Sequence, residues 1–147
     1  MEQKNEMSII FDSRSCNEGF ARVAVAAFCT QLNPTLEEVS DVKTAVSEAI
    51  TNCIIHGYDN EVKKIRIDCR TVNRDLHVWV TDEGKGIEDV KKAMEPMYTT
   101  RPELERSGMG FAFMEAFMDE VRVESKIGCG TSVYMRKNIG KQNCPYD

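Results

Sequence analysis

The sequence contains neither a long hydrophobic run nor a cluster of basic residues. Its longest uncharged apolar stretch, from Val23 to Cys29, is far shorter than the roughly 20 residues that a membrane span requires. No apolar signal core follows Met1, so we expect the chain to stay in the cytoplasm. Because the formal net charge is -5 and no basic stripe is present, we expect neither a membrane nor a nucleic acid as a direct partner.

The cysteines lack the spacing of a metal or redox site. No Cys-x-x-Cys pair occurs, and the six cysteines are scattered through predicted helices and strands: Cys16, Cys29, Cys53, Cys69, Cys129 and Cys144. In a reducing compartment such residues act as small apolar side chains. They therefore indicate neither a disulfide framework nor a zinc site.

Several common nucleotide-binding signatures are also missing. The chain has no G-x-x-x-x-G-K-[ST] run, which excludes a P-loop protein. It lacks the glycine-rich strand loop and the H-R-D sequence of eukaryotic protein kinases. A G-x-G-x-x-G pattern that begins at Gly84 fails at its sixth position, which is Asp89.

The residues that are present predict one domain with two N-terminal helices. A chain of 147 residues with 41% hydrophobic and 29% charged residues is typical of a single globular domain. Ser15 with Glu18, and Thr35 with Glu38, have the spacing of capping boxes, so a helix should begin at each pair. Apolar residues at helical spacing predict the buried faces, which are Phe20, Val23, Ala24, Ala27 and Phe28 in the first helix and Val39, Val42, Val46, Ala49, Ile50 and Cys53 in the second. Gly57 is placed to end the second helix.

The rest of the chain predicts a sheet. Alternating apolar residues indicate strands over 65–69 and 76–80 joined by a hairpin turn, in addition to a strand over 8–13. A short helix over about 111–119 and two strands over about 121–125 and 131–136 close the domain, with a glycine turn at 128–130. Residues 94–109 have no clear period and are predicted to form a lid, and 138–147 a tail. The predicted fold is an α+β two-layer sandwich, in which helices cover one face of a mostly antiparallel, mixed sheet.

Glu48, Asn52 and His56 form a candidate polar row on the second helix. Their i, i+4, i+8 spacing places them on the flank of the apolar stripe, where a side chain can be partly desolvated. A carboxylate there can orient or deprotonate a hydroxyl group, and an amide oxygen suits Mg2+. Taken alone, the row is explained better by a solvated helix edge with a satisfied His near its C-terminus.

Two glycine-containing loops complete the candidate site. Asp82 ends a strand and can accept hydrogen bonds from the amino edge of adenine, while Gly84 and Gly86 let the backbone approach a ligand. Exposed N–H groups just before an apolar helix favour anion binding. The residues in that position are Ser107, Gly108, Met109 and Gly110. Thr99, Thr100 and Arg106 offer phosphate donors just before it. A simple turn and a flexible hinge are the competing explanations of the two loops.

The three motifs in this order resemble the Bergerat (GHKL) ATP-binding fold, which gyrase, Hsp90, MutL and histidine kinases share. Residues 128–131 are similar to the closing glycine-threonine turn of that family. From a length of 147 residues we expect neither the coupling domain of the gyrase group nor the phosphoacceptor hairpin of a histidine kinase. Segments 18–23, 47–52, 54–58 and 99–111 are instead similar to the anti-sigma-F factors of spore-forming bacteria, which are stand-alone serine kinases.

That resemblance implies a homodimer that holds the RNA polymerase sigma-F factor inactive when ATP is bound, and that phosphorylates an anti-sigma factor antagonist on serine. It implies that Asn52 binds Mg2+, that Glu48 is the base for the attacking serine hydroxyl and that Asp82 recognises adenine. Arg106 would reach the terminal phosphate, and Arg22 would contact both protein partners. The remaining ATP-binding residues it implies are His56, Gly84, Gly86, Thr99, Thr100, Ser107, Gly108, Met109, Gly110 and Thr131. Two alternatives stay open: a nucleotide-gated sigma-binding module with little kinase activity, and a kinase that serves a stress sigma factor.

Overall fold

A computed structural model describes residues 3–87, 89, 90, 94 and 110–140 of the chain. Most of the predicted lid and residues 141–147 of the predicted tail are not among them. The site predictions that lie outside the described residues are Thr99, Thr100, Arg106, Ser107, Gly108 and Met109.

The described strands form one five-stranded antiparallel sheet in the order β1-β2-β3-β5-β4. Their bounds are β1 Lys4–Asp12, β2 Lys64–Val72, β3 Asp75–Asp82, β4 Glu120–Lys126 and β5 Gly130–Asn138. Val72 pairs with Asp75 across the predicted β2–β3 hairpin, and Asn73 adopts a φ of 54° in its turn. Every pairing between these strands is antiparallel, so the described sheet is not mixed.

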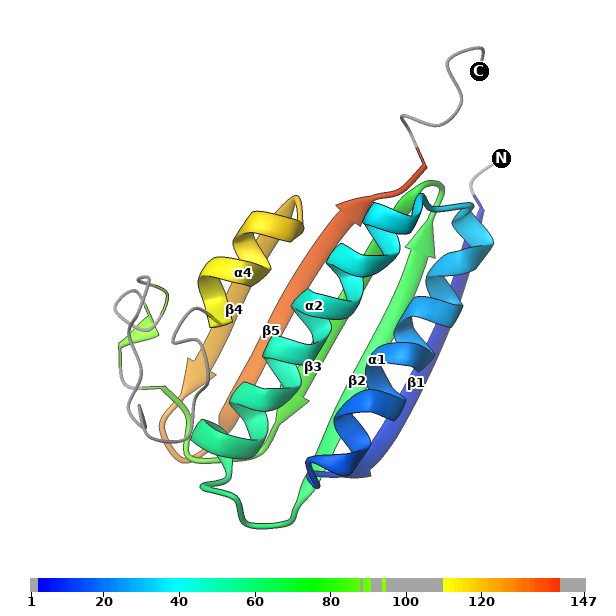
Figure 1. The fold of residues 1–147 in the computed structure, drawn as a ribbon. Coiled ribbons are helices and arrows are strands. Elements are labelled where there is room, and N and C mark those ends of the chain that lie inside the picture. Colours follow the sequence, from blue (N-terminus) through cyan, green and yellow to red (C-terminus); the bar gives the residue numbers. More distant parts are fainter. Residues whose placement is uncertain (1–2, 88, 91–93, 95–109, 141–147) are drawn as a thin grey trace.

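Helices cover one face of this sheet, as Figure 1 shows. They are α1 Cys16–Cys29, α2 Leu36–Asn52 and α4 Gly110–Phe117, with a 3-10 turn at Thr30–Leu32 and a π-helical turn, η2, at Cys53–Gly57. α2 packs between α1 and α4. The predicted α+β two-layer sandwich is therefore confirmed. Among the described residues, no helix is long and apolar enough to cross a membrane.

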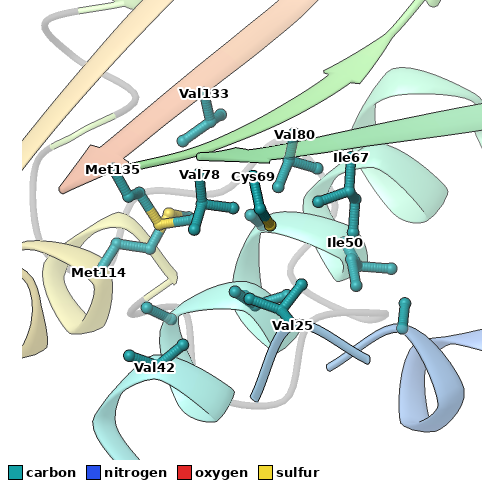
Figure 2. Packing of buried hydrophobic residues seen from close by; sticks show 14 of the residues in the cluster. Val25, Val42, Ile50, Ile67, Cys69, Val78, Val80, Met114, Val133 and Met135 are labelled. Atoms are coloured by element: carbon teal, nitrogen blue, oxygen red, sulfur yellow. The ribbon is translucent and has the colours of Figure 1, made fainter. Parts of the chain in front are cut away.

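The core lies between the sheet and α2. Alternate residues of β2 and β3 point toward the helices and are buried, namely Ile65, Ile67, Cys69, Leu76, Val78 and Val80. Ile50 and Val42 of α2, Val25 of α1 and Met114 of α4 pack against this layer (Figure 2). This layer is the rigid support on which the ends of α2 and β3 are held.

The predicted buried face of α1 is wrong except for Phe28, which packs partly buried against the core. The helix buries Ala21, Val25, Ala26 and Cys29, whereas Phe20 and Val23 are 58% and 53% exposed. Because apolar residues occupy most of the circumference of α1, their spacing does not distinguish one face from another. Small side chains on the buried face let α1 approach α2 closely.

One of the two predicted capping boxes forms. The Thr35 side chain accepts the N–H of Glu38, and the Glu38 carboxylate accepts the N–H of Thr35. At the start of α1, the Ser15 side chain makes no capping hydrogen bond. The carboxylate of Glu18 instead accepts hydrogen bonds from Arg22 on the next helical turn and from Ser47 on α2. Glu18 therefore contacts Ser47 of a different helix and does not form the predicted capping box with Ser15.

Replacing Glu38 by alanine should lower the free energy of unfolding by about 2 kcal/mol. This side chain is only 9% exposed, and besides its capping bond it accepts the N–H of Gly140 at 3.1 Å. Its removal leaves the N–H groups of Thr35 and Gly140 without this acceptor. Urea unfolding of Glu38→Ala beside Glu37→Ala, an exposed residue in the same helical turn, measures the difference. Equal stability of the two variants would contradict this role.

Candidate nucleotide-binding site

Three segments distant in the sequence meet at one end of the sheet. They are the end of α2 with its π-helical turn, the end of β3 and the turn between β4 and β5 (Figure 1). Asp82, the last residue of β3, pairs with Thr131 at the start of β5. The Lys85 N–H donates to the carbonyl of Gly57 at 3.1 Å, which joins the loop after β3 to the end of η2. The fold thus brings Asp82, Gly84 and Thr131 together.

Asp82 is a buried carboxylate, with only 4% of the residue exposed. Burial raises its pKa above the usual range, while the neighbouring Gly84 N–H, Cys53 thiol and Thr131 N–H act on that pKa in the opposite direction. The Gly84 bond measures 2.8 Å. A carboxylate offers about four acceptor positions, so the Gly84 bond leaves at least one position for a donor of a ligand. An amino group of a ligand is suited to that position.

Cys53 belongs to this site although no motif indicated it. The residue is 3% exposed and begins the π-helical turn. Burial, followed by the charge of Asp82, raises the pKa of its thiol well above the ordinary value. The sulfur therefore keeps its proton and can donate a hydrogen bond.

The glycines bring segments of backbone together. A Cβ on Gly84 would lie 2.2 Å from the carbonyl oxygen of Gly57, and one on Gly130 would lie 2.1 Å from the carbonyl oxygen of Asp82. Gly86 has a φ of 81°, and its Cβ would lie 2.3 Å from the carbonyl oxygen of Lys126. Gly84 and Gly86 were predicted to let the backbone approach a ligand, and that role stays a prediction, because the backbone that they meet here is the protein's own. These contacts set the shape of the loop after β3.

Tyr58 and Ser125 hold the same loop and were also missed. The Tyr58 hydroxyl donates to the carbonyl of Lys64 at 2.5 Å and accepts the N–H of Glu83 at 2.7 Å. The Ser125 hydroxyl accepts the N–H of Ile87 at 2.6 Å and lies 2.8 Å from the Thr131 hydroxyl. Tyr58 lies in segment 54–58, which carries part of the family resemblance, and Ser125 lies in no such segment. The sequence predicted no role for either residue, because each holds a segment far away in the sequence.

The predicted polar row of Glu48, Asn52 and His56 does not lie on one continuous α-helix. Glu48, Asn52 and His56 are all half-buried, as expected for the flank of the apolar stripe. The α-helix ends at Asn52, however, and the Tyr58 N–H donates to the carbonyl of Cys53 at 2.9 Å across the π-helical turn. His56 therefore does not continue the α-helical row, because a π-turn rotates each residue by a smaller angle. Gly57 is the last residue of this turn, so the predicted end of the second helical segment is confirmed.

The two other described site predictions lie elsewhere in the helical layer. Gly110 is the first residue of α4, so a helix does follow the predicted anion-binding segment. Arg22 lies on α1 with its side chain 41% exposed, and its Nη1 is 3.1 Å from the carboxylate of Glu18. Its Nε is buried and makes no hydrogen bond within the described residues. Through Glu18, Arg22 is connected to Ser47, the neighbour of Glu48 in the sequence.

Comparison with known proteins agrees with this architecture. Residues 15–137 match the histidine kinase-like ATPase domain, and the chain belongs to that family. A solved structure of the RsbU and RsbW domains of a Mycobacterium tuberculosis protein is similar in fold, with a TM-score of 0.65 at 17% identity. The match covers 92% of this chain and 32% of that one.

Within the family, the chain groups with proteins named anti-sigma F factor. It is 60% identical over 136 residues to the one from Clostridium novyi, covering 92% of this chain and 95% of the relative. It is 57% identical over 141 residues to that of Caldanaerobacter subterraneus, covering 96% and 99%. For Oceanobacillus iheyensis the identity is 54% over 145 residues, covering 98% and 99%.

Proposed function

We propose that this chain is a nucleotide-dependent anti-sigma factor that also acts as a protein serine kinase. With ATP bound it binds and inhibits the sigma-F factor, and it phosphorylates a serine of the anti-sigma factor antagonist. The observation that carries this proposal is the buried Asp82 carboxylate with a free acceptor position, at the site where the histidine kinase-like ATPase family is expected to bind nucleotide.

The donor set of the site fits adenine. A carboxylate that must lose water on burial is stabilised by N–H donors, and the exocyclic amine of adenine is such a donor. The Gly84 N–H donates to the Asp82 carboxylate, and the backbone of Gly130 lies against the Asp82 carbonyl. Thr131 lies directly opposite Asp82 in the sheet and completes this end of the proposed pocket.

Asn52 is the proposed Mg2+ ligand, with His56 nearby on the π-helical turn. No group of three or more His, Cys, Asp or Glu that could hold a metal occurs among the described residues. Mg2+ in kinases is commonly held by one or two protein groups together with phosphate oxygens and water. A single amide oxygen on the flank of α2 is compatible with that arrangement.

Phosphoryl transfer depends on positioning and charge neutralisation more than on covalent chemistry by the protein. ATP, when bound, would supply the phosphoryl group. Glu48 would accept the proton of the attacking serine hydroxyl, because its carboxylate is half-buried on the helix that carries Asn52. Arg106 and the remaining phosphate-binding residues stay sequence-based proposals: Thr99, Thr100, Ser107, Gly108, Met109 and Gly110.

The proposed partners are proteins. The relatives carry the name anti-sigma F factor, which supports sigma-F as the target in the cytoplasm. Arg22 is the proposed contact residue for sigma-F and for the antagonist, and its partly exposed side chain on α1 suits that role. A homodimer is the proposed assembly.

Complex formation with sigma-F should depend on the nucleotide. We expect the chain to co-elute with sigma-F during gel filtration in the presence of Mg2+ and ATP, and to bind it more weakly with ADP. Asp82→Asn should reduce the difference, because the amide replaces one acceptor oxygen by an NH2 donor and leaves a single uncharged oxygen for both the Gly84 N–H and the adenine amine. Equal binding with both nucleotides would contradict nucleotide dependence, and stronger binding to a stress sigma factor would identify a different target.

A further inference from the structure

Glu18 joins α1 to α2 beside the side chain of Arg22. Its two carboxylate oxygens accept hydrogen bonds from the Arg22 Nη1 at 3.1 and 3.2 Å, one helical turn further along α1. The same carboxylate accepts a hydrogen bond from the Ser47 hydroxyl of α2, which lies 29 positions away in the sequence. The side chain of Glu18 is only 19% exposed. This carboxylate is therefore held by groups of two different helices.

The bonds to Glu18 use only part of the guanidinium of Arg22. Both of them come from Nη1, whereas a guanidinium carries N–H donors on all three of its nitrogens. The Nε is buried and makes no hydrogen bond within the described residues, while 41% of the whole side chain is exposed. Donors therefore remain for acceptor oxygens of a second protein, on a guanidinium that is already held on one side.

We propose that Glu18 and Ser47 are positioning residues, which hold the guanidinium of Arg22 in the orientation that binds acceptor oxygens of a protein partner. This inference rests on the proposed function, in which Arg22 contacts sigma-F and the antagonist. A free arginine side chain has many rotamers, and immobilising it costs part of the binding free energy. The bonds of Glu18 restrict these rotamers before the partner arrives, and the Ser47 hydroxyl restricts Glu18.

A role for Glu18 as a competitor of the partner would have the opposite sign. A carboxylate that only occupied the guanidinium would have to be displaced, so its removal would strengthen partner binding. The hydrogen bond from Ser47 and the low exposure of Glu18 favour positioning, because both keep the carboxylate at the contact between α1 and α2. The direction of the change in affinity therefore decides between the two roles.

The test measures the dissociation constant of fluorescently labelled sigma-F by anisotropy, with Mg2+ and ATP present. Since ordering one long side chain weakens binding by up to about tenfold, we expect a roughly threefold loss for Ser47→Ala and a roughly fivefold loss for Glu18→Ala. In a chain that already carries Arg22→Ala, adding Ser47→Ala should have no further effect, because the group that Ser47 positions is gone. The ATP affinity of Ser47→Ala, measured by calorimetry, should stay unchanged.

Ser40 provides the matched control for Ser47. Both serines belong to α2, but Ser40 is exposed whereas Ser47 is half-buried. Ser40→Ala removes the same hydroxyl from the same helix, about two turns before Ser47, and should leave sigma-F binding unchanged. Ser47→Thr keeps a hydroxyl donor and should retain the affinity within about twofold, which separates the hydrogen bond from the packing of the side chain.

The failure of this inference is distinguishable from the failure of the proposed function. If Glu18→Ala or Ser47→Ala binds sigma-F as tightly as the unmodified chain, or more tightly, the inference is overturned and nucleotide-dependent binding of sigma-F stands. A further loss from Ser47→Ala in the Arg22→Ala background would also overturn it, because Ser47 would then act independently of Arg22. If the unmodified chain does not bind sigma-F with ATP, the proposed function and this inference fail together.

Discussion

Glu48→Gln should lower serine phosphorylation of the antagonist by ~10²-fold or more while ATP still binds. Glutamine has the shape of glutamate and cannot accept the proton of the attacking hydroxyl. The residue is half-buried on α2, one turn before Asn52, so the change leaves the proposed Mg2+ ligand in place. Transfer from labelled ATP under single-turnover conditions measures the rate, and calorimetry measures nucleotide affinity.

Glu37→Gln provides the control for this substitution. Glu37 is an exposed residue in the first turn of the same helix, so its replacement removes the same charge far from the proposed site. The control should retain the unmodified rate. Unchanged transfer by Glu48→Gln would remove Glu48 from the role of base. If the unmodified chain transfers no phosphate and still inhibits sigma-F, the nucleotide-gated binding module becomes the better description.

Gly84→Ala should lower the free energy of unfolding by about 3 kcal/mol and weaken ATP binding at least about tenfold. The added Cβ would lie 2.2 Å from the carbonyl oxygen of Gly57 and 2.6 Å from its carbonyl carbon. Both are backbone atoms, so relief requires the loop and the π-helical turn to separate. The Gly84 N–H, which holds the carboxylate of Asp82 at 2.8 Å, would move with the loop.

Gly19→Ala is the matched substitution at a glycine without such a contact. Gly19 lies inside α1, and a Cβ there would meet nothing within 4 Å. Alanine is favoured over glycine inside a helix by about 1 kcal/mol, so this variant should gain stability and bind ATP normally. Urea unfolding and calorimetry on both variants test the pair. A Gly84→Ala variant as stable as the unmodified chain would show that the loop accommodates the methyl group without loss.

Patterns among residues close together in the sequence predicted the helices and strands that such residues stabilise. The α2 helix follows from the Thr35–Glu38 capping box and a single apolar stripe, and the β2–β3 hairpin follows from two alternating runs and a tight turn. For α1, such local patterns predicted only part of the structure. Its start was predicted, but its buried face and the partner of Glu18 were not, because both depend on the position of α2.

The sequence by itself determined the two-layer fold, the family and the order of the nucleotide motifs, since these depend on periodicity and on residues close together along the chain. Only the tertiary structure decided which groups surround Asp82. The contacts of Gly57 with Gly84 and of Tyr58 with Glu83 join positions more than twenty residues apart. Their spacing leaves no pattern in the sequence, because burial between α2 and β3 brings them together only after the core has packed.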